Sequence, residues 1–99
     1  MKQGDYRSAV YYAKKLFEAC PDSEKHLKMR IKSAIYYAPN NLGEILRLTQ
    51  SVAEIFNDSA VFHFWHGRVL LYRGDVKKAN EHLCLAIELD PNNEKYRNF

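Results

Sequence analysis

The residues best suited to metal chemistry are two histidines, His63 and His66, which lie three positions apart in a segment with helical periodicity. Histidines at positions i and i+3 of one helix can share a metal ion. No acid or thiol pair at ligand spacing accompanies them, and His82, in a later segment, is expected to point elsewhere. We therefore expect His63 and His66 to pack between helices rather than to bind a metal.

Enzyme chemistry has equally little support. Cys84 and His82 are two positions apart, a spacing that separates them around a helix and denies a nucleophile–base pair. The four glycines stand singly, so there is no phosphate-binding loop. Asp5 and Asp75 have the context of helix caps, and Asp58 that of a turn. We expect no enzymatic activity, no metal and no cofactor.

Two stripes of side chains are better suited to binding. One is cationic, the other is aromatic with an arginine, and spacings of three or four place each on one side of a helix. The cationic stripe consists of Lys25, Lys28 and Lys32, and the aromatic stripe of Phe64, Arg68 and Tyr72. Side by side, they could hold an extended peptide with acidic and apolar side chains.

The same residues also have plainer interpretations. The lysines can form an ordinary solvated face, and the aromatic residues can pack against a neighbouring repeat absent from this sequence. For Trp65, the single tryptophan, we favour the binding surface. Tyr11 and Tyr12 are expected to contact solvent or a helix that precedes Met1.

Apolar residues that recur every three or four positions predict helices at about 6–19, 24–37, 42–56, 60–73 and 76–89, with a sixth beginning near 94. Ser23 and Asp75 are suitable N-caps, and Pro21 and Pro91 end helices. No segment alternates like a strand, so we predict an all-α single domain of antiparallel helix pairs. The residues expected to face inward include Leu16, Phe17, Ile31, Ile45, Ile55, Ala79 and Ala86.

The sequence also repeats itself. QGDYRSAV, residues 3–10, and RGDVKKAN, residues 73–80, lie seventy positions apart, and each precedes a proline at the same offset. APNN at 38–41 falls between them, which gives a period of about 34 to 36 residues. Helix–turn–helix units with such a period stack because one unit cannot bury its apolar stripe alone.

Residues 67–93, GRVLLYRGDVKKANEHLCLAIELDPNN, closely resemble the tetratricopeptide repeat (TPR) consensus. The matching positions are Gly67, Leu70, Gly74, Ala79, Leu83, Ala86 and Pro91. Residues 24–59 depart from it, with Ile31 and Ile45 where small residues are usual, so their helices are expected to pack further apart. The resemblance implies part of a right-handed α-solenoid from a longer protein: half a repeat (4–23), a divergent repeat (24–59), a full repeat (60–93) and the start of another helix (94–99).

In TPR proteins the first helix of each pair lines a concave surface, which implies a peptide-binding groove here. The residues that the resemblance places in this groove are Lys25, Lys28, Met29, Lys32, Tyr36, Phe64, Trp65, Arg68 and Tyr72. The family's clamp for terminal carboxylates is not reproduced, because its Asn, Lys and Arg positions hold Met29, Val61 and Trp65. A register in which the clamp starts at residues 24–59 matches Lys28 but has Lys32 in place of Asn, so we expect binding of internal acidic–apolar segments.

Residues 4–25, GDYRSAVYYAKKLFEACPDSEK, are similar to repeats of the J-domain co-chaperones that carry TPR arrays. This similarity implies the adaptor region of a chaperone-associated protein. The implied partner is a protein or peptide, such as a heat-shock chaperone.

Composition bounds the alternatives. Fifteen Lys and Arg against twelve Asp and Glu give a net charge of +3, which is too small to favour nucleic acid as the main ligand. Two alternative functions stay open: an RNA-binding helical-repeat module and a structural subunit of a larger complex. Cys20 and Cys84, expected to be partly buried, are too few for a disulfide framework, and no apolar run approaches membrane-spanning length. We expect a cytoplasmic or nuclear protein without a membrane partner, able to self-associate through its terminal repeats.

Overall fold

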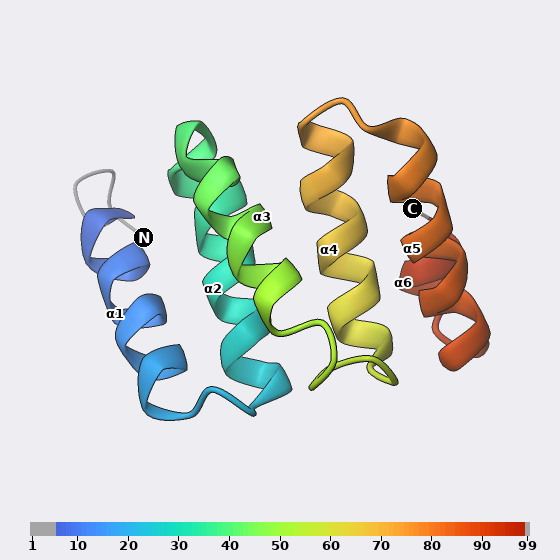
Figure 1. The fold of residues 1–99 in the computed structure, drawn as a ribbon, viewed down its shortest axis with the longest axis horizontal. Coiled ribbons are helices and arrows are strands. Elements are labelled where there is room, and N and C mark those ends of the chain that lie inside the picture. Colours follow the sequence, from blue (N-terminus) through green and yellow to red (C-terminus); the bar gives the residue numbers. More distant parts are fainter. Residues whose placement is uncertain (1–5, 99) are drawn as a thin grey trace.

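The computed structural model describes residues 6–98, in which every regular element is a helix (Figure 1). The elements are α1 (Tyr6–Ala19), α2 (Glu24–Tyr37), the short 3-10 helix η2 (Pro39–Asn41), α3 (Leu42–Ser51), α4 (Ala60–Tyr72), α5 (Val76–Leu89) and α6 (Glu94–Arg97). The all-α prediction is therefore confirmed for this part of the chain. Gly4 and Asp5, expected to open the first helix, lie outside the described residues.

The helices stand side by side as antiparallel neighbours, with α3 in front of α2 and α6 behind α5 (Figure 1). Helix α2 packs against both α1 and α4, and α4 packs most extensively against α5. This arrangement puts α2 and α4 at the centre of the molecule. No helix within residues 6–98 has the length and apolarity needed to cross a membrane.

Helix starts follow the local cap chemistry of the sequence. Ser23, Ser59, Asp75 and Asn93 each accept a hydrogen bond at 3.0–3.3 Å from a backbone N–H in the first turn of the helix that follows. Gly74 has a φ of 88°, which lets the chain reverse between α4 and α5. The N-caps predicted at Ser23 and Asp75 are confirmed.

The contact between α4 and α5 depends on small residues. A Cβ atom on Gly67 would lie 3.0 Å from Leu83 Cγ and 3.1 Å from the backbone oxygen of Ala79. Ala79 and Ala86 are completely buried in the same contact. Gly67 therefore lies where α4 and α5 approach each other closely.

Helix α3 is shorter than the sequence predicted. It ends at Ser51, whereas we expected it to reach residue 56, and the residues that follow form turns. Val52 and Phe56 are buried from these turns, but Ile55 is 62% exposed and was wrongly expected to face inward. The contact of α3 with α2 is smaller than that of α4 with α5.

The core surrounds α4, in which every residue from 62 to 70 is buried. A helix that is buried on all sides needs neighbours on all sides, and α2, α3, α5 and α6 supply them. Three expectations at the periphery were wrong: Leu16 was expected to face inward, and Cys20 and Cys84 to be partly buried, but all three are exposed.

Candidate functional site

Four of the five residues predicted on the surface of α2 are exposed there. Lys25, Met29, Lys32 and Tyr36 are exposed, while Lys28 is half-buried. They lie on one side of α2 because their spacings are close to multiples of the helical turn. The sequence therefore predicted the α2 part of the surface correctly in position.

Arg68 of α4 was also predicted on this surface, but it is only 8% exposed and lies at its base, where it contacts the exposed Tyr36. Its guanidinium carbon lies 5.8 Å from the centre of the Tyr36 ring and 4.6 Å from that of Trp65. A hydrogen bond from Arg68, together with its positive charge, lowers the pKa of the Tyr36 hydroxyl. These contacts hold the Arg68 guanidinium beside the Tyr36 hydroxyl, where α4 and α2 meet.

Phe64 and Trp65 are not surface residues, which corrects the prediction that they line a groove. Their exposed fractions are 1% and 2%. The Phe64 ring stacks on Tyr96 of α6 at 4.6 Å between centroids, and the Trp65 ring lies beneath Arg68 and Lys95. Both pack against α6 of this chain, whereas the alternative interpretation expected a repeat absent from the sequence, and Trp65 supports the cations from below.

Lys95 is a member of this surface that sequence reasoning missed. Its ammonium nitrogen lies 5.7 Å from the centre of the Trp65 ring. Burial and the charges of Lys95 and Lys32 lower the pKa of Lys28, so the three ammonium groups share one neighbourhood. The only signal in the sequence was that EKYRNF begins a helix, which did not show where that helix packs.

We call Lys28, Lys32, Tyr36, Arg68 and Lys95 the cationic surface. It contains four positive side chains from three helices around one tyrosine, so it repels other cations and favours carboxylates or phosphates. Lys25, in the first turn of α2, and Tyr72, at the end of α4, are exposed at its margins.

An apolar pocket adjoins the cationic surface between α1 and α2. Its volume is about 270 Å³, and it shares Lys32 and Tyr36 with that surface. We call it the tyrosine pocket, and it is lined by Ala9, Tyr12, Ala13, Met29, Lys32, Ser33, Tyr36 and Tyr37. Tyr12 was expected to contact solvent or a preceding helix, so its place in this wall was missed.

The histidines form a cluster that the sequence did not predict in full. His82 was expected to point elsewhere, yet its ring stacks on that of His66 at 4.3 Å and its Nδ1 lies 3.0 Å from Nδ1 of His63. The backbone oxygen of Asn57 can only accept, so His63 donates to it from Nε2 at 2.8 Å. The three rings are packed between α4 and α5.

This histidine cluster is not arranged as a metal site. Within residues 6–98, no group of three or more His, Cys, Asp and Glu side chains is placed to hold a metal ion. Burial lowers the pKa of His66 to about 4, with further contributions from His82 and His63. Burial of His66 in this contact therefore disfavours its protonation.

Comparison with models of known protein families finds no match for the chain, and comparison with characterised proteins finds none either. The function must therefore be inferred from the surfaces themselves.

Proposed function

We propose that the chain is a non-catalytic protein-interaction module built from TPR-type repeats, and that it serves as the adaptor region of a chaperone-associated protein. The TPR interpretation is supported by the sequence period and by the close approach of α4 and α5 at Gly67 and Ala79. It is also supported by the way α2 and α4, the first helices of two successive pairs, pack against each other.

The observation that carries the proposal is the union of the cationic surface with the tyrosine pocket. Lys32 and Tyr36 belong to both, so an apolar side chain in the pocket would lie beside at least three positive charges. An extended peptide with acidic residues next to an apolar one satisfies both features. Burial lowers the pKa of Lys28 most, and the charges of Lys95 and Lys32 add to this effect, so an anion would relieve part of the repulsion among the three lysines.

The partner segment need not end at this site. Terminal carboxylates are bound tightly where several donors converge on both oxygens. The clamp positions instead hold Met29, Val61 and the buried Trp65, which offer no such set of donors. We therefore propose that internal acidic–apolar segments bind, and that amidation of a peptide terminus has no effect.

Fluorescence anisotropy tests the proposal with a labelled peptide that carries a leucine between glutamates and a proline that keeps it extended. We expect binding that is lost in Lys32→Glu/Lys95→Glu and retained in the matched double charge reversal Lys77→Glu/Lys78→Glu, since both of these lysines are exposed on α5. A peptide with glutamines in place of the glutamates should bind at least tenfold more weakly, about 1.4 kcal/mol. Equal binding of the two peptides would refute the proposal.

An RNA ligand is the second candidate, because the same surface combines lysines with exposed tyrosines. Single-stranded RNA binding would fall steeply with salt as counterions are released. We expect a labelled oligouridine to bind much more weakly than the acidic peptide at physiological salt. Tighter binding of the oligouridine would replace the peptide proposal with the RNA alternative.

A further inference from the structure

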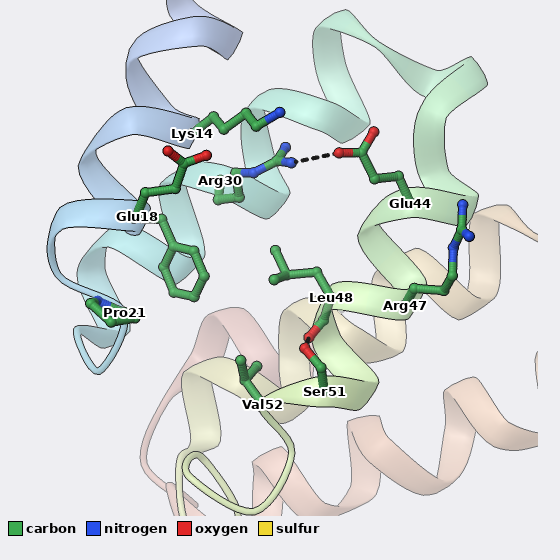
Figure 2. Close-up of a pocket in the computed structure, with 10 residues that line it drawn as sticks. Lys14, Glu18, Pro21, Arg30, Glu44, Arg47, Leu48, Ser51 and Val52 are labelled. Carbon is green, nitrogen blue, oxygen red and sulfur yellow. Dashed lines mark hydrogen bonds and ion pairs between the residues drawn. The ribbon is translucent and has the colours of Figure 1, made fainter.

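A groove runs between α1 and α3 (Figure 2), and we propose that it binds a short amphipathic helix that carries carboxylates beside its apolar residues. The larger part of the groove has a volume of about 580 Å³. It is lined by Lys14, Phe17, Glu18, Pro21, Arg30, Glu44, Arg47, Leu48, Ser51 and Val52.

The groove exists because α3 packs only slightly against α2, so α2 forms its floor and α1 and α3 form its walls. Phe17 and Val52 are buried within it, and Leu48 points into it from α3 (Figure 2). These side chains give one end of the groove an apolar surface.

A second, smaller cavity of about 160 Å³ continues the groove and shares Lys14, Arg30 and Glu44 with the first. Its remaining wall is apolar and consists of Val10, Ala34, Ala38 and Ile45. The groove therefore has an apolar stretch on each side of a charged crossing. A helix that presents apolar residues one or two turns apart, with a carboxylate between them, matches the order apolar, charged, apolar along the groove.

The charges at the crossing favour an acidic partner. Arg30 is only 7% exposed, and its guanidinium reaches Glu44 at 3.3 Å (Figure 2). Glu18, the other acid of the rim, is 4.0 Å from Lys15. Within residues 6–98, Lys14 and Arg47 have no carboxylate at ion-pair distance, so two cations on opposite walls remain for the carboxylates of a ligand.

A helical ligand suits this groove because its apolar and charged side chains can follow the apolar stretches and the charged crossing at helical spacing. A helix satisfies its own backbone N–H and C=O groups, so only its side chains need partners in the groove.

The groove is independent of the cationic surface. Successive residues of an α-helix are rotated by about 100°, so Arg30 lies roughly 160° around α2 from both Lys28 and Lys32. The two binding surfaces therefore lie on opposite sides of α2, and one can be removed while the other is kept.

Titration of a labelled, hydrocarbon-stapled peptide with leucines at helical spacing and glutamates beside them tests this proposal. We expect saturable binding to the whole chain, weakened roughly tenfold in Lys14→Glu/Arg47→Glu, because both positions are exposed and their reversal leaves the core intact. The reversals Lys77→Glu and Lys32→Glu/Lys95→Glu should leave this binding unchanged, which separates it from the peptide site. A control peptide with lysines in place of the glutamates should bind at least tenfold more weakly.

Equal binding of the two stapled peptides, or no effect of Lys14→Glu/Arg47→Glu, would overturn the proposal. Sedimentation of the chain alone provides a second test, because a second copy of the chain could occupy the groove in place of the helical ligand. If the chain dimerises and Lys14→Glu/Arg47→Glu returns it to a monomer, the groove is a self-association surface and the proposal is wrong. A monomer in both cases supports it.

Discussion

The hairpins α2–α3 and α4–α5 contain the same kinds of element and pack very differently. In α4–α5, two helices of 13 and 14 residues lie together along their length, with Gly67, Ala79 and Ala86 at the contact. In α2–α3, the second helix has only 10 residues and makes a small contact with the first. Ile31 and Ile45 are completely buried where the other hairpin has its small residues.

The difference shows that side-chain volume at a helix crossing decides whether a hairpin closes. Small residues bring α4 and α5 so near that not even a Cβ atom fits freely at Gly67. In α2–α3 two buried isoleucines stand in place of such small residues, and a groove lies between α1 and α3. We call α4–α5 the closed hairpin and α2–α3 the open hairpin. The closed hairpin is expected to supply rigidity, and the open hairpin a binding surface.

The largest expected effect on stability comes from removing a buried side chain from the open hairpin. Ile45→Ala should destabilise the protein by about 2–5 kcal/mol, because it removes a buried side chain from a space that its neighbours cannot close. Urea denaturation followed by circular dichroism measures this free energy of unfolding. A loss below about 1 kcal/mol would mean that α3 collapses onto α2 and that Ile45 is not what holds the hairpin open.

A somewhat smaller effect is expected from forcing the closed hairpin open. Gly67→Leu should cost about 1–3 kcal/mol, because the added atoms would meet Leu83 and the backbone of Ala79. Gly43→Ala is the matched control in α3, where the new Cβ would lie an ordinary 3.4 Å from Arg73 Nη1. That control should stabilise the protein by about 0.5–1 kcal/mol through helix propensity. Equal unfolding midpoints for the two variants would contradict the contrast between the hairpins.

Acid should also lower the free energy of unfolding, through the histidines packed in the closed hairpin. The pKa of His66 is lowered from 6.5 to about 4, and burial lowers that of His82, although Glu81 partly opposes this. The unfolded chain therefore binds protons first, so the stabilisation is present above pH 6.5 and is lost as the pH falls toward 4. We expect a loss of about 1–2 kcal/mol over this range, allowing for partial solvent screening.

The variant His66→Phe provides the comparison for the acid effect. It keeps an aromatic ring against His82 but removes the titrating group, so its stability should depend less on pH than that of the unchanged chain. Identical pH profiles for the two proteins would show that the histidine cluster does not couple folding to protonation.

Local features of the fold were predictable from the sequence. The range of α2 and the N-caps at Ser23 and Asp75 were predicted correctly, because caps and proline act within a few residues. The end of α3 was not, since Val52 and Phe56 continue the apolar periodicity although their side chains reach the core from turns. Periodicity reports burial and cannot by itself distinguish a helix from well-placed turns.

Longer-range features of the site were not predictable. Trp65 and Arg68 are neighbours on one helix, but only the position of α6 decides that Trp65 is covered by Lys95. The approach of His82 to His63 likewise depends on the register between α4 and α5. Such contacts require the packing of whole helices, which spacing along one helix does not contain.

The decisive measurement is the map of backbone amide chemical-shift changes when the extended acidic peptide is added to isotope-labelled protein. The largest changes should fall on Lys28, Lys32, Tyr36, Arg68 and Lys95, with smaller ones at the tyrosine pocket, and they should disappear in Lys32→Glu/Lys95→Glu. Changes confined to the α1–α3 groove, or none at saturating peptide, would contradict the proposed function.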